Sequence, residues 1–356
     1  MKSKKLPLIL GIDTSCDETA ASVILGMNVL SNVISSQVEL HNEFGGVVPS
    51  IAKREHQIRI DPVIKKALKN ASKIYKKEIN LKDLDAISVT YGPGLAIALE
   101  VGILKAKELS KVENIPLIAV NHMAGHLYSV LGLNSKGRAG LPLSKVRFPV
   151  LGFLLSGGHT ELILLKDFQD FEIVGQTLDD AVGEAYDKVA RMLGLGYPGG
   201  KLLSDFAKLG DPSTYKLPIP MGKDKSLNMS FSGLKTAVYY QVKNIEKERP
   251  LKKQEVFDFS ASFEKSVVAE LQIKLKLAIE RYNPKMIWVG GGVSSSARVR
   301  SGLRKVAQEK SIDIYFPALK NIYTDNAAMI AIASTFQFAR GDFADQSLDR
   351  KPNLVL

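Results

Sequence analysis

Short apolar runs alternate with longer amphipathic segments along most of this chain. Runs of four to eight residues bounded by turn residues are typical of strands, and apolar residues spaced three or four apart are typical of helices. The predicted strands are residues 8–12, 20–25, 30–35, 86–90, 115–120, 149–155, 161–165, 172–177, 285–289 and 312–316. The predicted helices are residues 51–71, 95–109, 180–193, 253–281, 297–308 and 327–339, with another starting at 230–236. This alternation predicts an α/β fold.

One unit of the pattern occurs twice. Residues 10–15, Leu-Gly-Ile-Asp-Thr-Ser, and residues 151–156, Leu-Gly-Phe-Leu-Leu-Ser, each end a strand at a small polar turn that leads into a return strand. Such a duplication resembles the two-lobed actin, Hsp70 and sugar-kinase superfamily, which pairs RNase H-like domains around a nucleotide cleft. We predict one lobe from residues 1–121 with 325–356 and a second from 122–324. The chain has no Walker A sequence, which excludes a P-loop.

Length and composition agree with a two-lobed globular protein. The 356 residues exceed the usual size of one core, and 45% are hydrophobic. The single cysteine, Cys16, excludes an internal disulfide and fits a reducing cytoplasm. No apolar run approaches a membrane span, and the run after the basic residues 1–5 is too short for a signal peptide. We therefore predict a cytoplasmic protein without a membrane partner.

The chain is basic, with a net charge of +11. Such an excess favours polyanionic partners, including RNA, although a solvated surface accounts for it equally well. Two runs concentrate the charge, and neither is interleaved with aromatic residues as a base-stacking surface would be. The runs are Lys65, Lys66, Lys69, Lys73, Lys76 and Lys77, and Lys243, Lys247, Arg249, Lys252 and Lys253.

A histidine pair suggests a metal site. His122 and His126 have the i, i+4 spacing that places two imidazoles on one helical face, where they can bind one metal ion. The zinc-protease signature carries a glutamate after its first histidine, and Met123 occupies that place here. An isolated pair of this spacing is more often structural. Asp325, just before a predicted helix, is either an N-cap or a third ligand.

Three turns are further candidates for binding or catalysis. The turn with Asp17 and Glu18 could bind phosphate or a metal, or supply a base, but it could also be a plain hairpin turn. Ser156-Gly157-Gly158-His159-Thr160 lets the backbone approach an anion closely. The glycines at 290–292 connect a strand to a helix, as in nucleotide-binding turns or in any close connection.

Together these motifs resemble one family. Asp-Thr-Ser-Cys-Asp-Glu-Thr, Asn-His-Met-Ala-Gly-His, Ser-Gly-Gly-His-Thr-Glu, Tyr-Pro-Gly-Gly, Phe-Ser-Gly-Leu-Lys-Thr, Gly-Gly-Val-Ser and Thr-Asp-Asn occur in order between residues 10 and 330. They are similar to those of the TsaD family, the tRNA threonylcarbamoyladenosine transferases once called O-sialoglycoprotein endopeptidases.

The resemblance implies a reaction and its partners. The donor is threonylcarbamoyl-AMP, and the acceptor is the N6 amine of the adenosine 3′ of the anticodon in tRNAs that read codons beginning with A. AMP is the second product. Bacterial members act with a smaller paralogue, TsaB, and an ATPase, TsaE. Two alternatives are a non-catalytic nucleotide-binding scaffold and a metalloprotease, and Met123 argues against the latter.

The resemblance also implies roles for residues. His122, His126 and Asp325 would bind one iron or zinc ion, and Asp17 and Glu18 are the carboxylates nearest the chemistry, with Asp17 as base. Ser156, Gly157, Gly158, His159 and Thr160 would hold the phosphate and carbamoyl region of the donor, with His159 either structural or an oxyanion donor. Asp187 and Gly200 would contact the adenylate, with Asp187 on the ribose, although Asp187 alone reads as a solvated helical carboxylate.

Two positions depart from the family pattern. The family has Asn, whose amide contacts the adenylate, at the position of Ser296. It has Gly at the position of Ala327, where a methyl group could crowd the metal side. Because the metal ligands and the Ser-Gly-Gly-His-Thr turn are intact, we expect activity to survive both changes.

Overall fold

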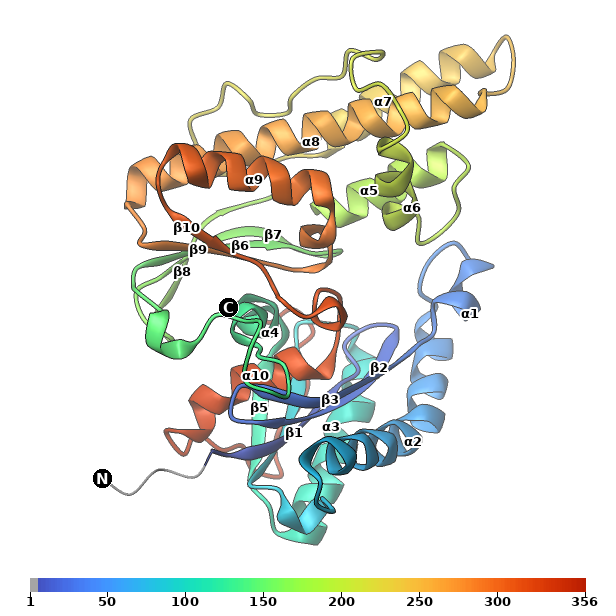
Figure 1. The fold of residues 1–356 in the computed structure, drawn as a ribbon. Helices are drawn as coiled ribbons and strands as arrows, with labels where there is room; N and C mark the ends of the chain where they lie inside the picture. The colour runs from blue at the N-terminus through green and yellow to red at the C-terminus, as the bar shows by residue number, and fades with distance from the viewer. Residues whose placement is uncertain (1–5) are drawn as a thin grey trace. The chain divides into compact units, whose positions relative to one another are not determined.

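Two five-stranded sheets form the framework of residues 6–356, the part of the chain that the computed structural model describes (Figure 1). The chain divides into two units. The first contains the described residues through Val146 together with Phe316–Leu356, and the second contains Arg147–Tyr315. The basic residues 1–5, on which the argument against a signal peptide partly rests, lie outside the described part.

The first unit combines one mixed sheet with helices from both ends of the chain. Its sheet order is β3-β2-β1-β4-β5, with β2 antiparallel to β1 and β3, and with β1, β4 and β5 parallel. The strands are β1 Leu8–Asp13, β2 Glu18–Leu25, β3 Asn28–Ser36, β4 Ala86–Gly92 and β5 Leu117–Asn121. The helices are α1 Val38–Asn42, α2 Pro49–Tyr75, α3 Ala96–Glu113, α4 His122–Tyr128 and α10 Ala327–Phe338.

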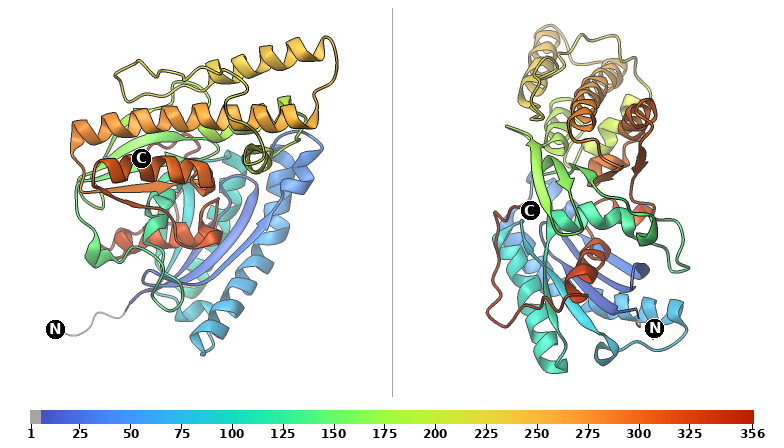
Figure 2. Two further views of the ribbon diagram at one scale, coloured as in Figure 1. Left: turned by 45° about the horizontal axis from the view of Figure 1, so that its top comes forward. Right: turned by 90° about the vertical axis from the view of Figure 1, so that its left-hand side faces the viewer.

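Helices pack on this sheet because their apolar residues recur on one face. In α2 the buried positions include Ala52, His56, Ile60 and Val63, which are three or four residues apart. Helices α2 and α3 contact each other, whereas α10 packs on β1 and against α4 (Figures 1 and 2). The approach of α10 is close, since a Cβ added at Gly11 of β1 would lie 2.4 Å from the carbonyl oxygen of Ala327.

The second unit repeats the architecture. Its sheet order is β10-β9-β6-β7-β8, with β7 antiparallel to β6 and β8, and with β6, β9 and β10 parallel. The strands are β6 Val150–Leu155, β7 Thr160–Leu165, β8 Phe171–Gln176, β9 Met286–Gly290 and β10 Asp313–Tyr315. The helices are α5 Val182–Met192, α6 Gly200–Ala207, α7 Ser232–Glu246, α8 Lys253–Tyr282 and α9 Ala297–Glu309.

The two sheet orders confirm the predicted duplication. Read from β8, the second order is third strand, second, first, fourth and fifth, which is the order of the first unit. Each unit is thus an RNase H-like domain with an antiparallel hairpin, β1–β2 or β6–β7, at the same place in its sheet. The predicted α/β class and two-lobed superfamily architecture are confirmed.

The predicted lobe boundaries differ from the observed ones. Residues 122–146 and 316–324 belong to the first unit, although we had assigned them to the second. The segment after α4 is hydrogen-bonded to the first sheet's β2–β3 connection, because Leu133 N–H donates to Met27 O and Val29 N–H donates to Leu133 O. All three predicted metal ligands therefore lie in one unit.

Most predicted elements are present with small shifts at their ends, but two helices were not foreseen. The Tyr197-Pro198-Gly199-Gly200 segment was predicted only as a turn, yet α6 begins at Gly200. Helix α1 has five residues, too few for an apolar periodicity to emerge. Within residues 6–356 no helix combines the length and apolarity that crossing a membrane requires.

Candidate functional site

The histidine pair lies where β5 passes into α4. Asn121 ends the strand and caps the helix, since its side-chain oxygen accepts from the N–H groups of Met123 at 2.8 Å and Ala124 at 3.3 Å. The cap fixes the first turn of a short helix, so His122 and His126 project from the same face. Both are buried, at 7% and 1% exposure.

Asp325 completes a cluster whose geometry fits a metal ion. Its Oδ1 lies 3.1 Å from Nε2 of His126 and 3.5 Å from Nε2 of His122. Ligand bonds of about 2.0–2.2 Å at tetrahedral or octahedral angles separate neighbouring ligand atoms by about 3.0–3.5 Å. His126 Nε2 is buried and makes no hydrogen bond despite this short distance, as expected when its lone pair points to a shared ion. We call His122, His126 and Asp325 the metal centre.

Asp325 is not the N-cap of α10. Asn326 has that role, because its side-chain oxygen accepts from Met329 N–H at 3.0 Å. The carboxylate of Asp325 is thereby left to face the two imidazoles. The N-cap alternative from the sequence is wrong, and the ligand alternative agrees with the geometry.

Asp13 is a site residue that the sequence analysis did not single out. It ends β1, is fully buried, and places Oδ1 3.7 Å from Nδ1 of His122, the nitrogen on the far side from Asp325. A carboxylate behind a ligating histidine orients the ring and raises its basicity. The available signal was its position at the carboxyl end of a central strand.

The charges around His122 favour a bound cation. Burial lowers the pKa of His122, but Asp325 and Asp13 outweigh that effect and raise its pKa to about 10. The pKa of Asp325 is held well below its usual value by the two histidines, against the effect of burial. Two carboxylates around two imidazoles thus form an electronegative pocket suited to a proton or a metal ion.

The turn between β1 and β2 carries Asp17 and Glu18, both partly exposed. Burial raises the pKa of Glu18 well above its usual value, and the neighbouring charges of Asp17, Asp325 and Asp13 add to the effect. The turn follows Asp13, whose Oδ1 lies 3.7 Å from Nδ1 of His122, so it begins beside the metal centre. Glu18 is therefore held toward its protonated form, which can donate a hydrogen bond.

In the second unit the predicted anion turn forms a tight hairpin between β6 and β7. Ser156 N–H donates to His159 O at 2.9 Å, and His159 N–H donates to Ser156 Oγ at 3.0 Å. Gly157 and Gly158 are exposed, and a Cβ added to either would meet nothing within 4 Å. We call Ser156–Thr160 the glycine hairpin. Its backbone is open to a ligand, as the sequence predicted.

Two other glycines support this hairpin and were not predicted to do so. A Cβ at Gly183, in the first turn of α5, would lie 2.7 Å from Ser156 O and 2.8 Å from Gly157 Cα. Gly291 has φ +88°, and its Cβ would lie 2.5 Å from Leu155 O. Both sites require glycine because backbone passes against backbone. The triple-glycine turn therefore packs behind the glycine hairpin.

Asp187 and Gly200 are neighbours. Asp187 Oδ1 accepts from Gly199 N–H at 3.0 Å and from Gly200 N–H at 2.7 Å. The carboxylate thus holds the first turn of α6, and the interpretation of Asp187 as a merely solvated carboxylate is wrong. Because a Cβ at Gly200 would lie 3.2 Å from Asp187 Oδ1, glycine permits the close approach.

Ser296 binds a buried glutamate that the sequence analysis missed. Its hydroxyl donates to Glu264 Oε1 at 2.8 Å, and its oxygen caps α9 by accepting from Val299 N–H at 3.4 Å. Ser204 and Tyr186 donate to the same Oε1, at 2.8 and 3.3 Å. Glu264 is fully buried and so connects α5, α6, α8 and the start of α9. The single donor of Ser296 is therefore committed to Glu264.

The other predicted surface and core features are as follows. Ala327 is fully buried as the first residue of α10 and does not prevent Asp325 from reaching the histidines.

Both lysine- and arginine-rich runs are exposed. Tyr239 and Tyr240 of α7, at 41% and 63% exposure, lie just before the second run, so aromatic side chains are closer to it than the sequence pattern indicated.

Comparison with known families gives a match over most of the chain. A family model described as "TsaD: tRNA N6-adenosine threonylcarbamoyltransferase" matches residues 28–332. A protein of that name from Caldicellulosiruptor saccharolyticus is 44% identical over 351 residues, which is 98% of both chains. Another, from Bacillus subtilis strain 168, is 43% identical over 362 residues, covering 100% of this chain and 98% of the relative.

Solved structures with low sequence identity share the fold. HypF from T. kodakarensis has a TM-score of 0.59 at 13% identity, covering 97% of this chain and 49% of that one. Component A of (R)-2-hydroxyglutaryl-CoA dehydratase from Acidaminococcus fermentans has a TM-score of 0.51 at 16% identity, covering 93% and 99%. These similarities concern the fold alone.

Proposed function

We propose that this chain, which belongs to the TsaD family of tRNA N6-adenosine threonylcarbamoyltransferases, transfers the threonylcarbamoyl group of threonylcarbamoyl-AMP. The acceptor is N6 of the adenosine directly 3′ of the anticodon in tRNAs that read codons beginning with A. The main structural support for this proposal is the close approach of His122, His126 and Asp325. The net charge of +11 and the exposed lysine runs support a polyanionic acceptor.

The metal centre would hold one iron or zinc ion. Two imidazole nitrogens and one carboxylate oxygen are ligands that both metals accept, and three protein ligands leave coordination positions for a substrate. When bound, such an ion supplies Lewis acidity to donor oxygens. Asp13 would orient His122 from the side opposite Asp325.

The transfer step needs a base and a good leaving group. The N6 amine attacks the carbamoyl carbon of the mixed anhydride, a new C–N bond forms, and the C–O bond to the AMP phosphate breaks. The amine must lose one proton, and we assign Asp17 to accept it. Glu18, held toward its acid form by burial and by Asp17, can donate a hydrogen bond to an oxygen on which negative charge develops.

Residues of the second unit would hold the donor. The open backbone at Gly157 and Gly158, with Ser156, His159 and Thr160 around it, suits the phosphate and carbamoyl region. Asp187 and Gly200 at the start of α6 suit the adenylate, with Asp187 on the ribose. Ser296 lies at the N-cap of α9, and because its hydroxyl donates to Glu264 and accepts from Val299 N–H, it keeps at most one lone pair to accept from the adenylate.

A direct assay tests this function. Purified chain is incubated with threonylcarbamoyl-AMP and unmodified tRNA, alone and with a TsaB-like paralogue, a TsaE-like ATPase and ATP, which we propose as its partners. Nucleosides are then quantified by mass spectrometry. Threonylcarbamoyladenosine at the position 3′ of the anticodon is expected. The Bacillus subtilis relative with its own partners is the positive control.

The outcomes separate the alternatives. No modified tRNA under conditions where the relative is active would contradict the proposal. Binding of threonylcarbamoyl-AMP without transfer would favour the nucleotide-binding scaffold, for which the serine at 296 is the motivating feature. Metal-dependent cleavage of a glycoprotein would favour the peptidase, which would need another base because Met123 occupies the place of the zinc-protease glutamate.

A further inference from the structure

The turn that carries Asp17 and Glu18 is held by its backbone carbonyls. Three consecutive carbonyl oxygens each accept a hydrogen bond from a different segment. Leu95 N–H donates to Ser15 O at 2.7 Å, the His56 ring donates to Cys16 O at 2.9 Å, and Gln37 N–H donates to Asp17 O at 2.9 Å. Of these three bonds, that of His56 alone comes from a side chain, so substitution can remove it.

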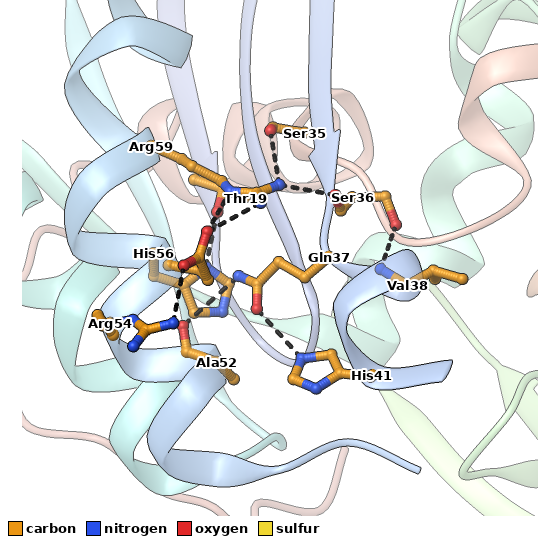
Figure 3. A network of polar contacts seen from close by, with 11 residues as sticks. Thr19, Ser35, Ser36, Gln37, Val38, His41, Ala52, Arg54, His56 and Arg59 are labelled. Carbon is orange, nitrogen blue, oxygen red and sulfur yellow. Dashed lines mark hydrogen bonds and ion pairs between the residues drawn. The ribbon is translucent and has the colours of Figure 1, made fainter. Parts of the chain in front are cut away.

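His56 also binds the other side of the carboxylate pair. Its Nδ1 lies 2.8 Å from Oγ1 of Thr19, the residue after Glu18. Both side chains are fully buried. One imidazole from the inner face of α2 therefore spans the Asp17–Glu18 dipeptide, from the carbonyl before it to the hydroxyl after it (Figure 3 shows His56 beside Thr19).

These partners fix the protonation state of His56. A carbonyl can only accept, so the proton on Nε2 must point at Cys16 O. Burial lowers the pKa of His56, which favours the neutral ring, so Nδ1 carries a lone pair and the Thr19 hydroxyl donates to it. The charged groups that act on the ring are Asp13 and Asp17, which raise its pKa, and Arg59 of the same helix, which lowers it.

A second buried histidine supports the next carbonyl indirectly. His41, fully buried, donates from Nε2 to Gln37 Oε1 at 3.3 Å, while its Nδ1 accepts from Val48 N–H at 3.3 Å. Gln37 in turn donates its backbone N–H to Asp17 O. Arg59, one turn after His56 on α2, donates to Ser36 O at 2.7 Å (Figure 3). Side chains of α2 therefore hydrogen-bond both to the turn and to the end of β3.

We propose that His56 is a positioning residue for the transfer reaction, acting on the orientation of Asp17 and Glu18 without touching substrate. This inference rests on the proposed function, in which these carboxylates act as base and hydrogen-bond donor. Loss of the bond to Cys16 O lets the turn move relative to the metal centre. Displacements of about 1 Å in a catalytic group can lower the rate about 100-fold.

The test compares substitutions on one helix. His56→Gln replaces the rigid ring with a flexible chain that cannot hold Cys16 O and Thr19 Oγ1 together, so it weakens both contacts. Thr19→Val is nearly isosteric and removes the hydroxyl alone. Ile60→Ala, four residues further along α2 and 3% exposed, is the control for a buried change that does not touch the turn. We expect kcat to fall about 10- to 100-fold in His56→Gln and less in Thr19→Val. KM for threonylcarbamoyl-AMP and metal content should stay within about threefold of wild type.

The double variant tests whether the two residues act as one clamp. If they do, His56→Gln with Thr19→Val should lower kcat no further than His56→Gln alone. Selective ¹⁵N-histidine NMR should show His56, assigned as the signal that disappears in His56→Gln, as a neutral ring protonated on Nε2. Thermal unfolding of each variant, compared with that of Ile60→Ala, separates loss of positioning from loss of fold.

Two results would overturn the inference. One is a kcat loss in His56→Gln no larger than in Ile60→Ala when both are equally folded. The other is protonation of the His56 ring on Nδ1, with the His56 signal assigned as the one that disappears in His56→Gln. If instead the wild-type protein makes no threonylcarbamoyladenosine, the proposed function fails, whereas an active wild type with an unaffected His56→Gln fails only this inference.

Discussion

At the scale of single residues, buried polar side chains carry most of the argument. Asp13, His122 and His126 are buried, and burial of polar groups costs free energy. A cation shared by these carboxylates and imidazoles would offset that cost. Their positions follow from strand ends, because Asp13 ends β1 and Asn121 ends β5 next to His122. His122 and His126 are close in the chain, whereas Asp325 and the supporting Asp13 come from distant parts of it.

Replacement of Asp13 should weaken metal binding without removing a ligand. Asp13→Asn keeps the shape but removes the charge behind His122 Nδ1, so the Kd for zinc or iron should rise about 10- to 100-fold. Titration of the metal-free protein with a competing chelator measures this. Asp61→Asn, an exposed aspartate of α2, is the matched control and should leave Kd unchanged. An unchanged Kd in Asp13→Asn would remove Asp13 from the site.

At the scale of elements, short turns between strand and helix bring the second unit's predicted ligand-binding residues together. The first turn of α5 passes behind the glycine hairpin, and the first turn of α6 is held by Asp187. Glu264, from the middle of α8, binds hydroxyls from α5, α6 and the start of α9. The geometry of the proposed donor site thus depends on the first turns of helices more than on the sheet.

Gly183→Ala should disturb the glycine hairpin. Its methyl group would meet backbone atoms at 2.7–2.8 Å, so either the hairpin or α5 must shift. We expect KM for threonylcarbamoyl-AMP to rise about tenfold or more, equivalent to about 1.4 kcal/mol, as measured in steady-state assays. Gly233→Ala is the control, because Gly233 is likewise the second residue of its helix and has open space around it. Equal KM values for both variants would contradict the prediction.

At the scale of the whole molecule, a buried carboxyl group of the second unit makes stability depend on pH. Glu270 of α8 accepts from Ser230 N–H at 3.0 Å through Oε1, while its buried Oε2 has no partner. Burial raises the pKa of Glu270 to about 8, although that hydrogen bond and Lys274 act in the opposite direction. The second unit therefore contains a carboxyl group that folding holds in its acid form.

The sign of the resulting pH dependence follows from proton binding. Between about pH 4.5 and 8 the folded state keeps the Glu270 proton and the unfolded state does not, so this group lowers the free energy of unfolding as pH rises. The contribution levels off above about pH 8. Glu270→Gln should remove this contribution to the slope. The free energy of unfolding of the variant, relative to that of the wild type, should therefore be higher at pH 8 than at pH 5. Urea unfolding followed by the fluorescence of Trp288 measures it, since this single tryptophan is buried in the second unit. Equal slopes for both proteins would refute the prediction.

The sequence alone predicted most strands and helices and the duplicated architecture, because both follow from local apolar spacing, although it missed α1 and α6. It also indicated the glycine hairpin and the histidine pair, whose residues are close in the chain. Spacing left Asp325 undecided between cap and ligand, and sequence neighbours could not say that Asn326 would take the cap.

The tertiary structure decided what distant segments do to each other. It brought Asp13 and Asp325 to either side of His122, placed His56 across the Asp17–Glu18 pair, and joined Ser296 to Glu264. It also places residues 122–146 in the first unit and not in the predicted second lobe. The physical reason is the same in each case: most buried polar groups need a partner, and that partner is set by packing and not by position in the chain.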